Sequence, residues 1–314
     1  MSALSDKSRL QRVLEQGNFS LTTEIGPPMS ADAQLVRKKA RMLVGAADAA
    51  NITDNQAAVV RMSSIAAGIL ASQEGIEPVI QMTCRDRNRI ALQSDLLGAW
   101  ALGARNLLCL SGDHPSLGNH KQAKNVYDID SIQLLQAVAR LQNEGVFLSG
   151  GKCRHPPHFF LGATANPFAD PSELQLMRLQ KKIAAGAQFI QTQAVYDVEA
   201  FEQWMARVRA LGLHEKAYIQ AGIVVNKSVK SIEMTRLVAG MRIPESYIDR
   251  MRAAGDAAAE GKAIALELIC RLRQVEGIRG IHIMSVGWEE VVPELAGESG
   301  LLPRPAAEQE DETV

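Results

Sequence analysis

The sequence has no excess of either charge, no long hydrophobic run and no export signal at its start. Its 34 basic and 35 acidic residues leave a formal net charge of −1, so it lacks the basic field by which nucleic-acid and membrane-surface proteins bind. No apolar run approaches the ~18 residues of a transmembrane helix, and residues 1–7 contain no apolar signal segment. We therefore expect a soluble, cytoplasmic protein that binds neither nucleic acid nor membranes.

Cysteines are few and scattered. The four, with no C-x-x-C pair among them, are Cys84, Cys109, Cys153 and Cys270, and a cytosolic protein keeps such thiols reduced. Residues 153–158, Cys-Arg-His-Pro-Pro-His, include metal-ligand residue types, but the segment has two prolines, a basic neighbour and no second ligand group nearby. We interpret it as a loop before a strand and predict no metal site.

What is present is an alternation of short apolar runs and longer amphipathic stretches. Strands are expected at 20–25, 47–53, 78–83, 106–111, 159–164, 189–192, 217–223 and 280–285. Helices are expected at 31–44, 63–73, 87–102, 129–143, 171–185, 198–211 and 229–239, with more than one helix within 246–275. Strand–helix units of roughly 35 residues, without the G-x-G-x-x-G of a dinucleotide-binding fold, predict an α/β protein with a single-domain (β/α)8 TIM barrel.

The same alternation sets the expected domain limits. Residues 1–18 form a helical lead-in, residues 19–295 form the barrel, and residues 296–314 form a C-terminal extension whose acidic end, 308–312, is flexible and solvated. No low-complexity linker divides the chain, and 46% hydrophobic residues are enough to build one full core.

Polar side chains close three of the expected strands. Glu24 ends an apolar strand just before Gly26-Pro27-Pro28, Asp113 follows the buried run 107–111, and Gln193 ends the strand that begins at 189. An acid inside an apolar strand is costly unless it is paired or functional, and barrel enzymes hold their active sites at the C-terminal ends of the strands. These residues therefore predict one converging site, although Asp113 taken alone is also compatible with a turn former or helix cap.

Ordered motifs along most of the chain carry a resemblance to a known family. They are Glu24 with Pro27-Pro28, Thr53, Met82-Thr83-Cys84, Gly112-Asp113, Tyr127, 182–187, Thr192-Gln193 with Asp197, Gly222-Ile223 and Arg242-Ile243-Pro244. In this order and spacing, from about residue 21 to residue 288, the chain resembles the methylenetetrahydrofolate reductases, flavin-containing barrel enzymes of one-carbon metabolism. Segments 166–170 and 282–290 are most similar to the branch found in acetogenic and related anaerobic bacteria.

The resemblance implies reduction of 5,10-methylenetetrahydrofolate to 5-methyltetrahydrofolate. The five-membered ring of this substrate must open to an N5 iminium before a hydride from flavin N5 reaches the methylene carbon. Glu24 would be the general acid that protonates N10, Asp113 would bind the substrate and stabilise the cation, and Gln193 would hydrogen-bond the pterin. The alternative is a pterin- and flavin-binding barrel that serves as a subunit of an electron-transfer or methyl-transfer complex and is inactive alone.

The resemblance also assigns residues to a flavin, either FAD or FMN. They are Thr53, Gln81, Ser111, Gly112, Asp113, Tyr127, Ala163 and Lys182. Gln81 stands where the family often has a His, Ser111 where it has an Arg, and Asp54 where it often has a Tyr. Lys182 is also compatible with an ordinary surface lysine near a helix C-terminus.

The reductant is either NAD(P)H or a protein electron donor. Aromatic residues that would stack on nicotinamide are thinned at Ile25, Ala194 and Val229, so we expect weak or no reduction by NAD(P)H. The acetogen branch implies electron-transfer proteins and a small zinc-binding partner subunit. The near-zero net charge leaves surface for such a partner or for a homo-oligomer.

Overall fold

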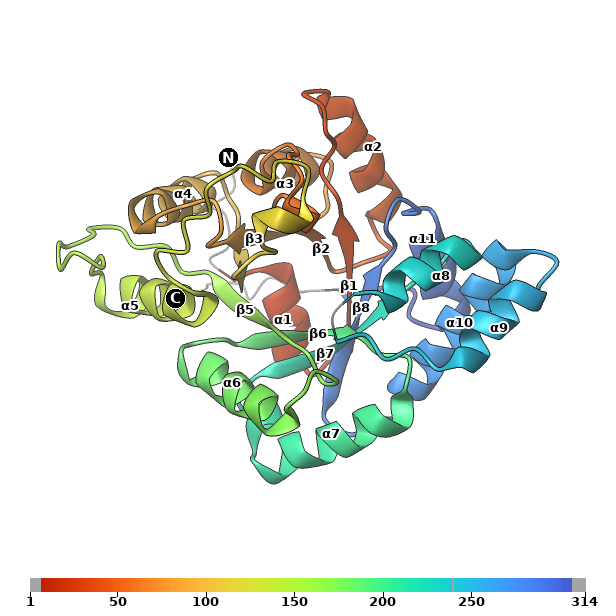
Figure 1. Ribbon diagram of the computed structural model, residues 1–314. Helices are drawn as coiled ribbons and strands as arrows, with labels where there is room; N and C mark the ends of the chain where they lie inside the picture. The colour runs from red at the N-terminus through yellow and green to blue at the C-terminus, as the bar shows by residue number, and fades with distance from the viewer. Residues whose placement is uncertain (1–6, 239, 307–314) are drawn as a thin grey trace.

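The structure is a computed structural model that describes residues 7–238 and 240–306. Its strands form one closed, parallel barrel in sequence order (Figure 1). They are β1 Ser20–Ile25, β2 Ala49–Ile52, β3 Pro78–Thr83, β4 Asn106–Leu110, β5 Phe160–Ala165, β6 Phe189–Ala194, β7 Tyr218–Val224 and β8 Ile278–Met284. Each lies within two residues of an expected strand at both ends, and the predicted (β/α)8 barrel is confirmed.

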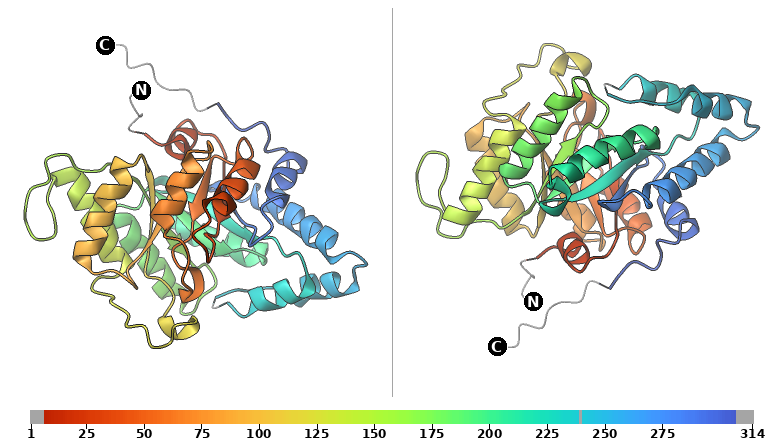
Figure 2. Two further views of the ribbon diagram at one scale, coloured as in Figure 1. Left: turned by 90° about the horizontal axis from the view of Figure 1, so that it is seen from above. Right: turned by 90° about the horizontal axis from the view of Figure 1, so that it is seen from below.

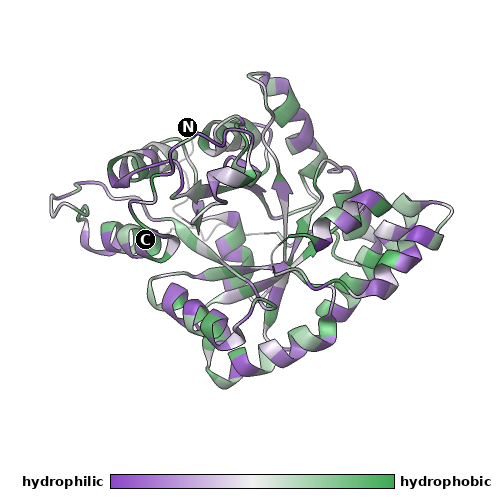
Figure 3. Cartoon of the chain, viewed as in Figure 1, coloured by the Kyte–Doolittle hydropathy of each residue, from purple (hydrophilic) through white to green (hydrophobic). Residues whose placement is uncertain are grey.

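Helices join successive strands and cover the outside of the barrel (Figure 1). After β1 to β6 come α2 Ala33–Leu43, α3 Ser64–Ser72, α4 Arg89–Ala101, α5 Ser131–Glu144, α6 Ser172–Ala184 and α7 Val198–Ala210. The connection after β7 contains α8 Val229–Arg236, α9 Glu245–Ala253 and α10 Ala257–Leu272, and α11 Val291–Glu298 follows β8. Hydrophobic and hydrophilic residues alternate around the helices (Figure 3), as amphipathic helices on a sheet require. The pair α8 and α9 extends away from the barrel on one side (Figure 2).

One end of the barrel is closed by α1, Arg9–Glu15. Leu10 and Leu14 of α1 pack against the first inward residues of the strands, among them Phe160 and Phe189, whose rings stack 5.0 Å apart. The described C-terminal segment returns to this end, where Arg304 Nε donates to buried Asp48 at 3.1 Å. The expected boundary at 295/296 lies inside α11, and the acidic end 308–312 lies outside the described residues.

The centre of the barrel is polar. Thr22 Oγ1 lies 3.0 Å from His282 Nδ1, Asn51 Nδ2 donates to Gln191 Oε1 at 2.6 Å, and Gln191 Nε2 donates to Gln220 Oε1 at 3.0 Å. All five side chains are buried, so each polar group needs such a partner. Side chains alternate along a strand, so the residues two positions after Thr22 and Asn51 also face the interior, at the mouth: Glu24 and Thr53.

Candidate active site

Glu24 lies at the barrel mouth, one residue before the end of β1. Its side chain is half-buried, and Gln56 Nε2 lies 3.5 Å from its Oε1. The pKa of Glu24 is raised to about 7, first by burial and then by the Glu289 carboxylate, while Lys39 lowers it. A large share of Glu24 is therefore protonated at neutral pH, as a general acid must be.

Sequence reasoning missed the two charged residues beside Glu24. Lys39, on α2, places its Nζ 2.6 Å from Oε1 of Glu289, which lies between β8 and α11, and also donates to the Gly26 carbonyl at 3.3 Å. Glu289 is only 5% exposed, so its charge is paired inside the protein. An acid in a turn beside the exposed Glu290 looks like a surface residue in the sequence, and nothing local marks it as buried.

Asp113 lies on the exposed loop after β4 and holds a second loop in place. Its Oδ2 accepts a hydrogen bond from the Ala57 N–H at 3.0 Å. That N–H belongs to the β2–α3 loop, where Asn55, Ala57 and Ala58 all have positive φ, a conformation that non-glycine residues keep only when neighbours hold it. Gln56 of the same loop reaches Glu24, so this loop links the two carboxylates expected to be catalytic.

Gln193 is placed at the mouth by an irregularity between β6 and β7. The register of the two strands shifts between Gln191 and Ala194, and such bulges redirect side chains. Thr192 holds the shift, because its Oγ1 accepts from the Gly222 N–H at 2.9 Å and donates to the Gln193 carbonyl at 2.8 Å. Gln193 itself is half-buried, and it lies on the inward face of β6 because its neighbour Ala194 is in the core between sheet and helices.

Three of the residues assigned to a flavin, Thr53, Gly112 and Tyr127, lie at the ends of β2 and β4 or in the segment after β4. Within the described part of the chain, the buried Thr53 hydroxyl has no hydrogen-bond partner. Gly112 has φ +89°, and a Cβ there would lie 3.0 Å from Thr83 Cβ, so the turn and its close packing against Thr83 require glycine. Tyr127 Oη donates to the Gly112 carbonyl at 3.1 Å.

Lys182 is not an ordinary surface lysine. It is 9% exposed, and its Nζ donates to the Thr164 carbonyl at 2.6 Å, near the end of β5. Burial first and then the charge of Arg178 lower the pKa of Lys182 to about 8. A buried ammonium with a single carbonyl partner has hydrogen-bonding capacity left for a ligand.

The remaining residues assigned to the flavin are Gln81, Ser111 and Ala163, and they lie in three different environments. Gln81 is half-buried and faces the interior two positions after Val79, which packs there. The Ser111 hydroxyl donates to Ser131 Oγ of α5 at 3.2 Å. Ala163 is fully buried in the core between sheet and helices, so its methyl cannot reach the mouth, and only its backbone remains available.

Two of the three positions expected to stack on nicotinamide also face the helices. Ile25 and Ala194 are fully buried in the core between sheet and helices. Aromatic side chains there would not reach the mouth, so the interpretation that these two positions had lost stacking residues is wrong. Val229, the half-buried first residue of α8, packs against the same core but is not fully buried.

An arginine cluster, also missed in the sequence, organises the neighbouring loops. Arg85 is 2% exposed and donates to the carbonyls of Asp113 at 3.2 Å and Asn55 at 3.2 Å, and its partner carboxylate is Asp86. Arg87 pairs with buried Asp54 at 2.6 Å. Asp54 is therefore committed to holding the loop after β3.

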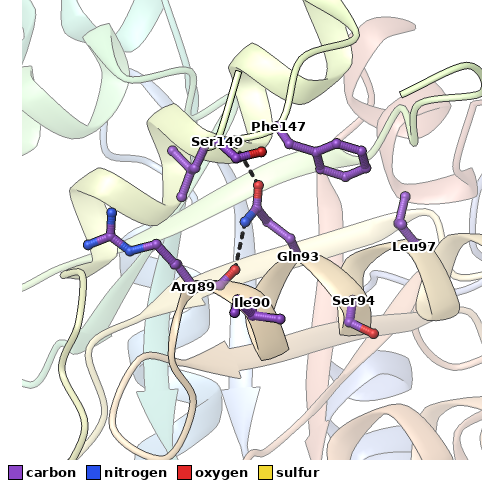
Figure 4. Close-up of a pocket in the computed structure, with 8 residues that line it drawn as sticks. Arg89, Ile90, Gln93, Ser94, Leu97, Phe147 and Ser149 are labelled. Carbon is purple, nitrogen blue, oxygen red and sulfur yellow. Dashed lines mark hydrogen bonds between the residues drawn. The ribbon is translucent and has the colours of Figure 1, made fainter. Parts of the chain in front are cut away.

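Two cavities lie away from these residues. One, of about 330 Å³, is a groove between α4 and residues 147–149, in which Gln93 bonds the Arg89 carbonyl and the Leu148 N–H (Figure 4). The other, of about 620 Å³, lies between the loop after β5, α7 and Arg242. Within residues 7–238 and 240–306, no three His, Cys, Asp or Glu residues group as metal ligands, and no helix has the length and apolarity to cross a bilayer.

Comparisons with known proteins identify the family of the chain. The family model described as methylenetetrahydrofolate reductase matches residues 9–300. The chain is 25% identical over 307 residues to the probable methylenetetrahydrofolate reductase (NADPH) of Caenorhabditis elegans, covering 93% of this chain and 44% of that protein. It is 24% identical over 243 residues to the 5,10-methylenetetrahydrofolate reductase of Pectobacterium carotovorum, covering 74% of this chain and 73% of that one.

The lengths of these relatives differ. The chain spans less than half of the Caenorhabditis elegans protein and of methylenetetrahydrofolate reductase 1 of Schizosaccharomyces pombe, at 44% and 36%. A Clostridium thermocellum protein that binds two copies of 5-methyl-5,6,7,8-tetrahydrofolic acid superposes with a TM-score of 0.61 at 17% identity, over 93% of this chain and 98% of that one. At this identity the likeness shows a shared fold.

Proposed function

The chain belongs to the methylenetetrahydrofolate reductase family, and from this premise we propose that it reduces 5,10-methylenetetrahydrofolate to 5-methyltetrahydrofolate. The observation that carries the proposal is Glu24, a half-buried carboxyl at the barrel mouth whose pKa is raised to about 7. The substrate is a cyclic aminal, and its ring opens only when one nitrogen is protonated as the C–N bond breaks. A carboxylic acid that is partly protonated at neutral pH meets this need.

Glu24 gives its proton to N10 as the bond from N10 to the methylene carbon breaks, which leaves an N5 iminium. Asp113, on the loop held by Ala57, offers the negative charge that stabilises this cation. Gln193, on the inward face of β6, hydrogen-bonds the pterin and orients it. The hydride then adds to the methylene carbon, and Glu24 regains a proton from solvent, to which its half-buried side chain has access.

A flavin fits the residues present at the mouth. The unpartnered Thr53 hydroxyl, the Gly112 backbone, Tyr127 and the Lys182 ammonium would hold it. When bound, the flavin supplies the hydride. The same residues are compatible with FAD and with FMN.

The proposal is tested by anaerobic turnover of flavin-loaded protein with reduced methyl viologen and methylenetetrahydrofolate, followed by chromatography of the 5-methyl product. Glu24→Gln is expected to lose roughly 10²-fold or more of this rate at pH 7 while keeping its fold and bound flavin, because only the proton donor is removed. The exposed Glu290→Gln is the matched control. Absence of product from the parent protein would contradict the reductase assignment, and parent-like turnover by Glu24→Gln would remove Glu24 from the mechanism.

A further inference from the structure

Glu24 does not stand alone at the end of β1. Lys39 from α2 and Glu289 from the segment after β8 lie beside it, and their charged atoms are 2.6 Å apart. β1 is hydrogen-bonded directly to β8, so the end of β1 and the segment after β8 are neighbours in the barrel. Two charged groups from the consecutive elements β1 and α2 and a third from the far end of the chain thus share one partly buried space.

The charges of this group decide where a proton is held. With all three residues ionised the group carries a net charge of −1, and with one proton added it is neutral. Glu289 is 5% exposed and has an ammonium partner, whereas the neighbour of Glu24 is the uncharged amide of Gln56. A carboxylate beside an ammonium stays ionised and one without such a partner takes up the proton, so the proton belongs on Glu24.

We propose that Lys39 and Glu289 are positioning residues that together set the protonation state of Glu24 for its role as general acid. This inference rests on the proposed function. Glu289 keeps the Lys39 charge from acting fully on Glu24, and Lys39 keeps Glu289 from competing for the proton. Lys39 also donates to the Gly26 carbonyl, two residues after Glu24, which fixes the ammonium relative to β1.

Other charged and titratable groups around the mouth have hydrogen-bond or ion-pair partners other than Glu24. On the β2 side, Asp54 is paired with Arg87 and accepts from the Thr83 N–H, and Asp113 accepts from the Ala57 N–H. Arg61 of the β2–α3 loop donates to the Pro27 carbonyl at 3.1 Å. On β8, His282 is paired with Thr22, two residues below Glu24 in β1. Lys39 and Glu289 are thus the charges that act most directly on Glu24.

The two residues are expected to act in opposite directions, which a purely structural role would not produce. Glu289→Gln leaves the Lys39 charge uncompensated, so the pH midpoint of folate turnover should fall by about one unit, with roughly tenfold lower rates above both midpoints. Lys39→Met leaves two carboxylates to share one proton, so the upper midpoint should rise by about one unit. The double variant removes both charges and should return the midpoint towards that of the parent.

The experiment combines turnover from pH 5 to pH 9 with a direct titration of Glu24. Side-chain carboxyls of Glu are labelled with carbon-13, and the Glu24 resonance is identified by its absence from Glu24→Gln. The exposed residues next in sequence supply the controls Lys38→Met and Glu290→Gln, which should match the parent. Opposite shifts in the resonance and in turnover support the inference. Unchanged midpoints, or shifts in the same direction, overturn it.

Two safeguards keep the result decisive. If Glu289→Gln fails to fold, Lys39→Met and the double variant still test the predicted rise and its reversal. The titration of Glu24 needs no turnover, so a parent protein that forms no 5-methyl product would refute the proposed function, while the titrations would still decide whether Lys39 and Glu289 control Glu24.

Discussion

At the scale of single residues, the charge of Asp113 can be separated from its hydrogen bond. The carboxylate accepts from the Ala57 N–H, and it is the negative group proposed to face the iminium. Asparagine keeps an acceptor oxygen of the same shape and removes the charge, whereas alanine removes both. The two substitutions therefore probe different physical properties.

Asp113→Asn is expected to slow folate turnover by about tenfold or more, because electrostatic stabilisation of the cation is lost, with a free energy of unfolding within about 0.5 kcal/mol of the parent. Asp113→Ala should lose the same rate and in addition about 1 kcal/mol of stability, since the bond holding the positive-φ loop is gone. Turnover assays and urea unfolding measure both. Parent-like turnover of Asp113→Asn would make Asp113 only a loop anchor.

At the scale of the barrel as an element, its polar centre makes stability depend on pH. Burial lowers the pKa of His282 from 6.5 to about 4, and the imidazole shares a hydrogen bond with Thr22. Below pH 6.5 His282 is protonated in the unfolded chain, whereas in the folded barrel it is protonated only below about pH 4. The free energy of unfolding therefore falls as the pH drops through this window.

His282→Gln keeps a neutral hydrogen-bonding side chain and removes this titration. Between pH 7 and pH 5 the parent should lose about 2 kcal/mol more stability than the variant does, as measured by urea unfolding at both pH values. Glu24 acts in the opposite sense, because its raised pKa lowers the free energy of unfolding as the pH rises from 4.5 to about 7. Both proteins contain Glu24, so the comparison of parent with His282→Gln isolates the effect of His282. The exposed His120→Gln should keep the parent dependence, and an identical dependence in His282→Gln would contradict the assignment.

At the scale of the whole molecule, the source of electrons separates a self-sufficient reductase from a subunit that needs a partner. Ile25 and Ala194 no longer support weak use of NAD(P)H, because both face the helices. Val229 at the start of α8 packs against the same core but is partly exposed, and its aliphatic side chain offers nicotinamide no stacking ring. We therefore still propose a protein electron donor.

The expected result is slow or absent flavin bleaching when oxidised protein is mixed with NADH or NADPH, and rapid bleaching by reduced methyl viologen. Stopped-flow absorbance near 450 nm measures both. Fast bleaching by either pyridine nucleotide at sub-millimolar concentration would show that the chain needs no protein donor. It would also remove the main reason for a subunit that is inactive alone.

Much of the site could be predicted because its signals are local. Glu24 precedes Gly26-Pro27-Pro28, and Gln193 follows a short β-prone run, so each strand end is visible within a few residues. Parallel strands of a barrel bring their C-terminal ends to one rim. The predicted convergence of Glu24 and Gln193 at the inward mouth follows from these two facts.

The side of a strand that a residue faces was harder to predict from the sequence. Polar and apolar residues alternate in part of these strands, as in Glu24-Ile25 and Gln193-Ala194, but the strands of a parallel sheet are usually buried on both faces, so the sequence does not show which set points to the helices. The barrel decides it through its polar centre, where Thr22 and Gln191 fix the inward set and thereby the outward one.

The sequence by itself determined the order of strands and helices, the barrel, the family resemblance and the identity of the proposed acid, because periodicity, turn residues and motif order are properties of neighbouring positions. Only the tertiary structure decided which charges meet. Lys39 and Glu289 lie near opposite ends of the chain and form an ion pair because barrel closure sets β1 beside β8. The protonation of Glu24 depends on that pair and on burial, and both exist only once the barrel has closed.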